Sequence, residues 1–323
     1  MENGEWVMEA DGECPLPSST LHPRFLLLAG PTAVGKSEIA LRVAETLGGE
    51  IVSVDSMQVY RGMDIGTAKP CPADRARVPH HLIDVVEVTE AFDAAKFVDR
   101  ARQAVAEIQR RGRVPILCGG TGLYFKAFLE GLGEAPPADA ALRAKLEATP
   151  LPELLRELAE GDPAAYKRID RQNPRRVIRA VEVIRLTGKP FSAQRANWRP
   201  SSLPAHPSPL QFGLARSSKD LHQRIANRVE AMFRRGWVAE TEQLLRQGLA
   251  QNRTAMQALG YRQIVEHLRG DRSLTETVAL VKVRTRQFAK RQMTWFRRQL
   301  ALTWINLASE DGAEAVGRIV AGV

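Results

Sequence analysis

The octapeptide Gly30-Pro31-Thr32-Ala33-Val34-Gly35-Lys36-Ser37 is the part of this sequence best suited to chemistry. It matches the phosphate-binding loop pattern G-x-x-x-x-G-K-[ST] at each fixed position. In such a loop, backbone N–H groups and the start of the next helix face an anion, while the lysine reaches the outer phosphates. We therefore predict a diphosphate or triphosphate site, with the Ser37 hydroxyl able to bind Mg²⁺. The alternative is a glycine turn that only connects a strand to a helix.

Two further side chains are expected at the same edge of a sheet. Asp55 ends the apolar run 51–54, and Thr121 lies in the glycine-rich segment that follows the apolar run 114–118. Ligands of open α/β sheets bind beyond the carboxyl ends of the strands. Asp55 could hold Mg²⁺ or act as a general base, or it could only cap the turn 55–58. Thr121 could offer a hydroxyl to a ligand or cap a helix.

Basic side chains concentrate in the second half of the chain. Arg224 and Arg228 are one helical turn apart, and either could point into the anion site. No acid interrupts the basic stretch made of Lys282, Arg284, Arg286, Lys290, Arg291, Arg297 and Arg298. A solvated helix face normally mixes both signs of charge, so this stretch suggests contact with a polyanion. The interleaved aromatic residues are better suited to the core than to base stacking. The Gln58 side chain is of a type that can read an adenine edge.

The elements that must position these residues alternate at first between strand and helix. We expect strands at 25–29, 50–54 and 114–118, helices at 37–47 and 94–111, and an irregular stretch from 55 to about 90. This pattern predicts an α/β fold, a P-loop NTPase-like parallel sheet flanked by helices. Further strands are expected at 211–215 and 302–306. The remaining expected helices are 138–148, 152–160, 163–169, 174–187, 219–235, 238–247, 259–269 and 274–300.

This order divides the chain into four parts. Residues 1–23 are interpreted as a disordered tail, and 24–131 as the first part of the α/β core. Residues 132–209 are predicted to be a helical insertion domain that ends in the proline-rich linker 199–209. Residues 210–323 would complete the core and add a basic helical C-terminal region.

Composition limits the class of protein. The chain has 323 residues, 44% of them hydrophobic and 26% charged, which is typical of a soluble globular protein. It has no apolar stretch of about 18 residues, so no membrane span is expected. Three cysteines without CxxC spacing favour reduced thiols in the cytoplasm over a zinc site. The net charge of +9 suits an anionic polymer as partner, although a basic housekeeping enzyme can carry the same charge.

Several motifs together resemble the tRNA dimethylallyltransferases, also called tRNA isopentenyltransferases. Besides the phosphate loop, the matching segments are Asp55 to Tyr60, Gly66-Thr67-Ala68-Lys69, Gly119 to Tyr124, Gln172 to Arg176, Leu221 to Arg224, Ala258 to Arg262 and Thr285 to Phe296. The resemblance covers about residues 25 to 306. The zinc-binding extension of eukaryotic relatives is absent from this sequence, which fits a bacterial-type enzyme.

The resemblance implies a reaction and a set of roles. The family transfers a dimethylallyl group from dimethylallyl diphosphate to N6 of the adenine 3′ of the tRNA anticodon, without ATP. Asp55 then matches the general base, while Lys36, Thr121 and Arg224, with Mg²⁺ held through Ser37, match the groups that stabilise the leaving diphosphate. The resemblance assigns contact with the tRNA anticodon stem-loop to Asp55, Ser56, Met57, Gln58, Thr121, Arg143, Gln172, Asn173, Pro174, Arg175, Arg176, Gln257, Ala258, Leu259, Gly260, Tyr261 and Arg262. A monomer is expected.

Three alternative functions would use part of the same sequence. An adenylate isopentenyltransferase would act on a free nucleotide, but it would not need the arginines of the insertion or the long basic helix. A P-loop small-molecule kinase would transfer phosphate from ATP, which the Gly119-Gly120-Thr121-Gly122 segment does not favour. A non-catalytic RNA-binding protein would not need Lys36 and Asp55 at one sheet edge.

Overall fold

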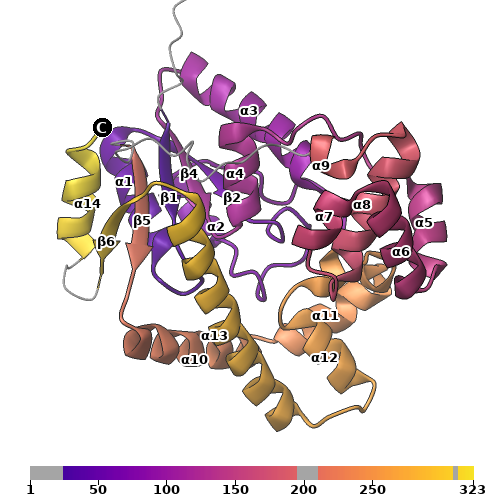
Figure 1. The fold of residues 1–323 in the computed structure, drawn as a ribbon. Helices are drawn as coiled ribbons and strands as arrows, with labels where there is room; N and C mark the ends of the chain where they lie inside the picture. The colour runs from indigo at the N-terminus through magenta and orange to yellow at the C-terminus, as the bar shows by residue number, and fades with distance from the viewer. Residues whose placement is uncertain (1–24, 195–209, 308–311) are drawn as a thin grey trace, which may run out of the picture.

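The fold is built on one parallel sheet, shown in Figure 1 in a computed structural model that describes residues 25–194, 210–307 and 312–323. The predicted tail 1–23 and the linker 199–209 lie outside the described residues. The six strands run in the order β3-β2-β4-β1-β5-β6. Their bounds are β1 Leu26–Ala29, β2 Glu50–Val54, β3 His80–His81, β4 Pro115–Gly119, β5 Gln211–Ala215 and β6 Thr303–Asn306.

The strand order explains why the predicted site residues meet. β1, β2 and β4 are buried along their whole length, as apolar strands covered on both faces should be. β4 lies between β2 and β1, with Gly119 in register with both Val54 and Ala29. The phosphate loop, Asp55 and Thr121 follow the ends of these three neighbouring strands. The predicted α/β fold with a parallel sheet is thus confirmed.

Helices cover the sheet and extend beyond its carboxyl edge. Around the sheet and below it (Figure 1) lie α1 Lys36–Leu47, α2 Pro72–Arg77, α3 Ala94–Arg110, α4 Gly122–Glu130, α10 Ser218–Arg234, α11 Trp237–Arg246, α12 Tyr261–Leu268, α13 Leu274–Gln299 and α14 Gly312–Val320. Two short 3-10 helices, η2 Leu249–Gln251 and η3 Ala255–Gln257, precede α12.

The structure corrects several predicted elements. The stretch 55–90 is not wholly irregular, because it contains α2 and the two-residue strand β3. The helices α4 and α14 were not predicted, and the helix predicted at 259–269 begins at Tyr261. Five consecutive residues of α4, from Tyr124 to Phe128, are buried. A helix that is buried on several sides shows no amphipathic period, so its sequence gives no helical signal.

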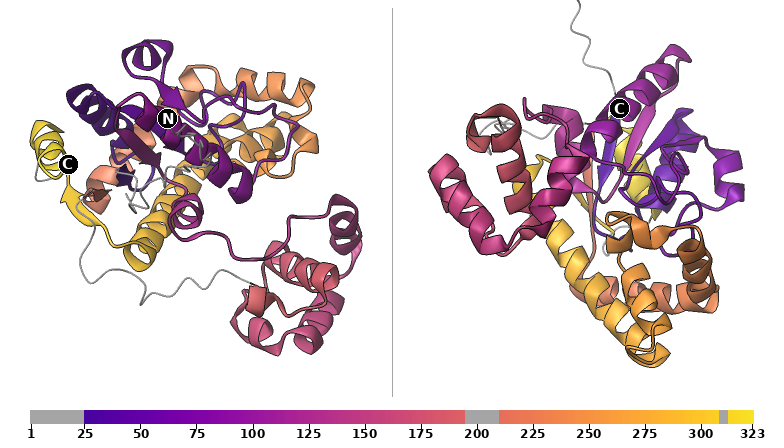
Figure 2. Two further views of the ribbon diagram at one scale, coloured as in Figure 1. Left: turned by 90° about the horizontal axis from the view of Figure 1, so that it is seen from above. Right: turned by 90° about the vertical axis from the view of Figure 1, so that its right-hand side faces the viewer.

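Five helices that lie between β4 and β5 in the sequence form a separate group. They are α5 Ala140–Ala148, α6 Leu151–Gly161, α7 Pro163–Arg168, α8 Pro174–Thr187 and α9 Phe191–Gln194. They share a hydrophobic cluster of their own, which includes Leu146, Leu158 and Val181. Figure 2 shows this group standing beside the sheet. The domain boundaries drawn from the sequence stay a prediction.

A buried carboxylate holds this group of helices together. Glu182 in α8 is fully buried, and its oxygens accept hydrogen bonds from the Asp139 backbone N–H at 3.1 Å and from Arg143 and Arg179 at 2.5 and 2.8 Å. Arg179 also donates to the Pro136 carbonyl at 2.6 Å. The sequence alone places Arg179 on the face of α8 opposite its apolar residues, but its guanidinium is bound within this group of helices. Arg143, a predicted tRNA contact, uses one guanidinium nitrogen to bind Glu182.

Replacing Glu182 by alanine is expected to destabilise these helices by about 2 kcal/mol, because it leaves the partly exposed Arg143 and Arg179 guanidinium groups and the Asp139 N–H without their common acceptor. The measurement is hydrogen–deuterium exchange of the α5 and α8 backbone amides in the full chain. Glu157→Ala is the control, since Glu157 pairs with Arg185 at 2.7 Å at the surface and should cost about 1 kcal/mol or less. Equal losses of protection in the two variants would contradict the interpretation.

Candidate active site

The phosphate loop connects β1 to α1 through a left-handed backbone conformation, which most residues other than glycine disfavour. Ala33 and Gly35 have φ of +65° and +111°, and α1 begins at Lys36. The Lys36 ammonium donates a hydrogen bond to the Pro31 carbonyl at 2.8 Å, which curls the side chain back over the loop. Loss of solvent around the ammonium lowers the pKa of Lys36 to about 8. Lys36 is thus a cation that lacks a strong anionic partner of its own.

Two arginines from the second half of the chain bind backbone carbonyls of this loop. Arg224 of α10 donates through Nε to the Ala33 carbonyl at 3.0 Å. Arg216, which follows β5, donates through Nε to the Val34 carbonyl at 2.8 Å. Both bonds satisfy carbonyls of the strained turn, so these guanidinium groups support the loop that must face an anion.

Gln292 of α13 is a residue that sequence reasoning missed. Its Oε1 accepts a hydrogen bond from the Thr32 backbone N–H at 2.9 Å, and its Nε2 donates to the Gly120 carbonyl at 2.8 Å. It therefore joins the phosphate loop to the segment that carries Thr121. No sequence signal separated Gln292 from the other polar residues of this long basic helix.

Asp55 and Thr121 lie beside each other beyond the ends of β2 and β4. Asp55 Oδ1 accepts hydrogen bonds from the backbone N–H groups of Met57 and Gln58 at 2.8 and 3.3 Å. In the described part of the chain, no residue donates to Asp55 Oδ2. The Thr121 hydroxyl accepts from the Ser56 backbone N–H at 3.1 Å. Thr121 stands at the N-cap of α4, but its side chain makes no capping hydrogen bond, so its hydroxyl faces the site.

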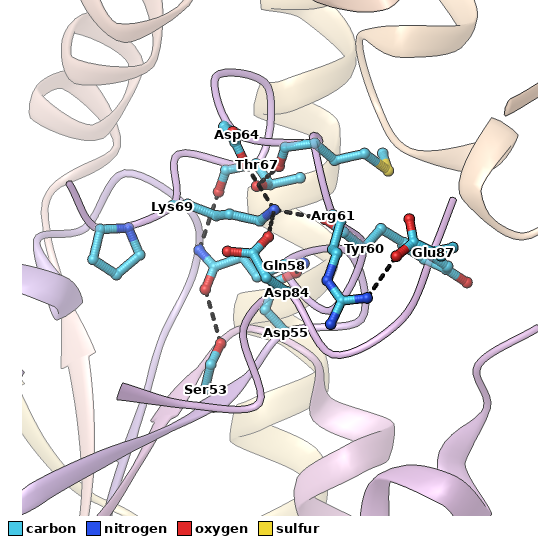
Figure 3. A network of polar contacts seen from close by, with 12 residues as sticks. Ser53, Asp55, Gln58, Tyr60, Arg61, Asp64, Thr67, Lys69, Asp84 and Glu87 are labelled. Atoms are coloured by element: carbon cyan, nitrogen blue, oxygen red, sulfur yellow. Dashed lines mark hydrogen bonds and ion pairs between the residues drawn. The ribbon is translucent and has the colours of Figure 1, made fainter. Parts of the chain in front are cut away.

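The Gln58 side chain is bound inside the protein, as Figure 3 shows. Its Oε1 accepts from the Ser53 hydroxyl at 2.8 Å. Its Nε2 donates to the carbonyls of Thr67 and Ala68 at 3.2 and 3.4 Å. To read an adenine edge, Gln58 would have to give up one of these bonds. The predicted contact of Gln58 with a base stays a prediction.

A cavity of about 400 Å³ brings these groups together. From the phosphate loop it is lined by Thr32, Lys36 and Ser37, and from the neighbouring strand ends by Asp55, Ser56, Met57, Gln58 and Thr121. An apolar wall comes from Ile225, Val229, Met232, Trp237, Ala258 and Leu259. The cavity therefore has a cationic end, a carboxylate and an apolar wall.

Arg228 is the arginine of α10 that lines this cavity, whereas Arg224 binds the Ala33 carbonyl of the phosphate loop. Among the described residues, none makes a hydrogen bond or ion pair with the Arg228 guanidinium. Its pKa is lowered because its surroundings exclude solvent; the Asp55 charge opposes this effect, and the Arg224 charge adds to it. A desolvated guanidinium without a partner is a group that an anion in the cavity would bind.

Other predicted tRNA contacts lie partly in the cavity wall and partly outside the cavity. Gln257, Ala258, Leu259 and Tyr261 line the cavity, while Arg262 forms an ion pair with Glu266 at 3.0 Å on the outer side. Gly260 packs against Trp237, whose ring leaves no space for a Cβ. The residues from Gln172 to Arg176 lie at the start of α8, outside the cavity.

The aromatic residues of α13 divide between core and surface. Phe296 is buried against Phe125, as predicted for a core residue. Phe288 is instead 38% exposed and lines the cavity, with the Arg291 guanidinium 5.9 Å from its ring centre. Phe288 and Arg291 therefore reach the cavity, whereas Phe296 does not.

The donor atoms of the site fit a magnesium ion that is held mainly through a substrate. The described residues contain no group of three or more acidic, histidine or cysteine side chains that could hold a metal. Ser37 and Asp55 offer oxygen atoms to the cavity. Mg²⁺ prefers oxygen ligands and is commonly bound by few protein groups together with substrate phosphates. The site therefore suits Mg²⁺ bound with a diphosphate.

Among the helices of the described residues, none has the length and apolar character needed to cross a membrane.

Comparison with known proteins places the chain among enzymes of one kind. The family model named IPP transferase matches residues 58–299. The tRNA dimethylallyltransferase 1 of Trichlorobacter lovleyi is 46% identical over 289 residues, which make up 88% of this chain and 94% of that protein. The tRNA dimethylallyltransferase of Pelotomaculum thermopropionicum is 44% identical over 302 residues, or 92% of this chain and 95% of that protein.

Solved structures agree with this comparison. The full-length tRNA isopentenylpyrophosphate transferase of Bacillus halodurans has a TM-score of 0.67 and 38% identity, over 93% of this chain and 95% of that one. A eukaryotic dimethylallyltransferase acting on tRNA has a TM-score of 0.71 and 25% identity, over 90% of this chain and 77% of that one.

Proposed function

The chain belongs to the IPP transferase family, and from that premise we propose that it is a tRNA dimethylallyltransferase. It transfers a dimethylallyl group from dimethylallyl diphosphate to N6 of the adenine 3′ of the anticodon and releases diphosphate. The observation that carries this function is the shared cavity, in which Lys36 of the phosphate loop, the Asp55 carboxylate and an apolar wall face one another. An isoprenoid diphosphate needs a cation such as Lys36 for its phosphates and an apolar wall for its hydrocarbon part. An amine nucleophile needs a base such as the Asp55 carboxylate.

The reaction follows from these groups. The adenine N6 amino group is a weak nucleophile, because its lone pair is delocalised into the ring. As its nitrogen bonds to the allylic carbon, the C–O bond to diphosphate breaks and one N6 proton passes to Asp55. The free Oδ2 can take that proton while Oδ1 stays bound to the backbone of Met57 and Gln58.

Negative charge develops on the leaving diphosphate, and cations placed in advance stabilise it. Lys36 and Arg228 both line the cavity at the phosphate-loop end. Arg224 supports the loop through the Ala33 carbonyl, and Thr121 presents its hydroxyl on the Asp55 side. Mg²⁺, when bound through Ser37 and the diphosphate, would supply further positive charge there.

The basic surfaces beyond the cavity suit an RNA partner. Arg175 and Arg176 are exposed at the start of α8, and α13 carries exposed basic residues up to its end. Phosphate contacts of this kind position a polynucleotide. The target adenine must leave the stack of the anticodon loop to reach the cavity. A free nucleotide would need neither surface, so the adenylate isopentenyltransferase is the less favoured function. Action as a monomer in the cytoplasm stays a prediction.

The test of the reaction class is its dependence on nucleotide. The purified protein is incubated with Mg²⁺, dimethylallyl diphosphate and unmodified tRNA in the absence of ATP, and diphosphate release is measured. We expect release that requires tRNA and is unaffected by ATP. Release with AMP in place of tRNA would support the free-nucleotide enzyme, and phosphate transfer from ATP would support a kinase.

The pKa of Lys36 predicts how donor binding depends on pH. Because this pKa is lowered to about 8 from 10.5, the free enzyme loses the Lys36 proton as the pH rises through 8. The KM for dimethylallyl diphosphate should be flat below that pH and rise by up to about tenfold per unit above it. Steady-state kinetics from pH 7 to 9.5 measure this rise. Lys36→Met should show a high KM that does not rise further with pH. A KM that stays constant up to pH 9.5 in the unmodified protein would contradict the role of Lys36.

A further inference from the structure

The motif Gly66-Thr67-Ala68-Lys69 has no role in the reaction described so far, yet its lysine is among the most buried charged groups of the molecule. The Lys69 side chain is 2% exposed. Its ammonium donates to the Tyr60 carbonyl at 2.6 Å, to Asp64 Oδ1 at 2.7 Å and to Asp84 Oδ1 at 2.5 Å (Figure 3). An ammonium has three protons, so these acceptors use all of them. Lys69 therefore cannot bind a substrate and must act within the protein.

The backbone around Lys69 is held in a costly conformation. Ala68, Leu82 and Asp84 have φ of +49°, +62° and +57°. In the described residues the only other non-glycine residue with positive φ is Ala33, in the phosphate loop. Such backbone conformations cost about 1 to 3 kcal/mol each and persist only where surrounding contacts enforce them. Lys69 supplies such contacts, because it follows Ala68 and binds Asp84.

The segments around Lys69 also bind Gln58, through both its side chain and its backbone. The carbonyls of Thr67 and Ala68 accept hydrogen bonds from Gln58 Nε2, and the Asp84 backbone N–H donates to the Gln58 carbonyl at 3.1 Å. Gln58 in turn donates its own backbone N–H to Asp55 Oδ1. A continuous chain of contacts thus runs from Lys69 through Gln58 to the carboxylate that takes the proton.

Glu240 of α11 secures the other side of the motif. Its Oε2 accepts from the backbone N–H groups of Ile65 and Asp64 at 2.7 and 3.2 Å. Its Oε1 accepts from the Gly66 N–H at 3.3 Å and from the Tyr261 hydroxyl at 2.7 Å. The motif is therefore tied to the opposite wall of the cavity as well, and movement of the motif would disturb both walls.

We propose that Lys69 is a positioning residue, which orients the Asp55 carboxylate through the side-chain bonds of Gln58 to the Thr67 and Ala68 carbonyls. The proposal rests on the proposed function, because it assigns to Lys69 an effect on the proton transfer from adenine N6. It predicts that loss of Lys69 slows the chemical step while the diphosphate end of the cavity, held by Gln292 and Arg224, keeps its geometry.

The test compares Lys69→Met with Lys126→Met in the full chain. Lys126 is a matched control, because it is fully buried and its ammonium binds Glu130 at 2.6 Å and the Gln299 carbonyl at 3.1 Å. Single-turnover rates with an anticodon stem-loop are measured well below the unfolding temperature of each variant. We expect Lys69→Met to lower the rate about 100-fold, the usual effect of a misplaced reacting group, with the donor KM nearly unchanged. Lys126→Met should keep its rate, whatever its loss of thermal stability.

A double-mutant cycle with Gln58→Met decides whether Lys69 acts through the Gln58 side chain, whose Nε2 donates to the Thr67 and Ala68 carbonyls. If it does, the double variant should be about as slow as Lys69→Met alone, because the second change removes a link already lost. Rates that multiply would overturn the proposal, as would a normal rate in Lys69→Met. Lys69→Arg keeps the charge but not the three bonds and should recover part of the rate. Should Lys69→Met fail to fold, the cycle with Lys69→Arg carries the same test.

The proposal and the proposed function can fail separately. If the unmodified protein prenylates the stem-loop and Lys69→Met is equally fast, only the positioning role fails. If the unmodified protein transfers no dimethylallyl group to RNA, the proposed function itself fails.

Discussion

Replacement of Asp55 by asparagine is expected to lower kcat about 10³-fold or more, while the affinity for tRNA stays within a few-fold. Asparagine keeps an oxygen that can accept from the Met57 N–H, as Asp55 Oδ1 does at 2.8 Å, so the turn should persist. It cannot accept a proton from adenine N6, however, and general-base catalysis contributes about 10² to 10⁴ in rate. Asp55→Ala should be at least as slow.

The measurement for Asp55 separates chemistry from binding. Single-turnover prenylation gives the rate of the chemical step, and fluorescence anisotropy with a labelled anticodon stem-loop gives the affinity. Asp99→Asn, on an exposed position of α3, is the control for loss of one negative charge. Equal losses of rate and affinity in Asp55→Asn would make Asp55 a binding or structural residue, and a normal rate would remove it from the mechanism.

Replacement of Arg228 by methionine is expected to lower kcat about 10²- to 10³-fold, because the guanidinium lines the cavity where charge develops on the leaving diphosphate. Arg224→Met should act mainly on the KM for dimethylallyl diphosphate, because Arg224 Nε binds the Ala33 carbonyl and so shapes the loop. Steady-state kinetics of the two variants, with the donor concentration varied, measure the difference. The reverse order of effects on kcat would give the leaving-group role to Arg224, as predicted from the sequence.

The sequence alone could not predict which of these two arginines reaches the anion site. The helical period placed Arg224 and Arg228 one turn apart on α10, and both could have reached the anion site. The choice depends on where α10 crosses the phosphate loop, which is set by packing between distant segments. The sequence contains no local signal for that crossing.

The central sheet could be predicted because its signals are local. Apolar runs such as 26–29 and 115–119 alternate with helical patterns, and a loop with the phosphate-binding pattern follows the first of them. The position of Asp55 beside that loop then follows from the parallel topology. The alternating part of the sequence therefore predicted the core of the site.

Residues that act through tertiary contacts could not be predicted in this way. Gln292 is separated from Thr32 by 260 positions, and Lys69 looks like an ordinary loop lysine until its three acceptors are seen. Helix α4 was missed because its buried faces erase the amphipathic period. Each case depends on side-chain packing in the folded chain, which composition and periodicity do not encode.

The proposed reaction transfers one dimethylallyl group to N6 of one adenine in tRNA. The most direct test is mass spectrometry of a tRNA digest after incubation with dimethylallyl diphosphate and Mg²⁺, with fragments assigned to positions in the anticodon loop. We expect N6-dimethylallyl-adenosine at the position 3′ of the anticodon, and none when that adenine is replaced by purine, which lacks the amino group. Unmodified tRNA together with turnover of another substrate, or a dimethylallyl group at a different atom, would contradict it.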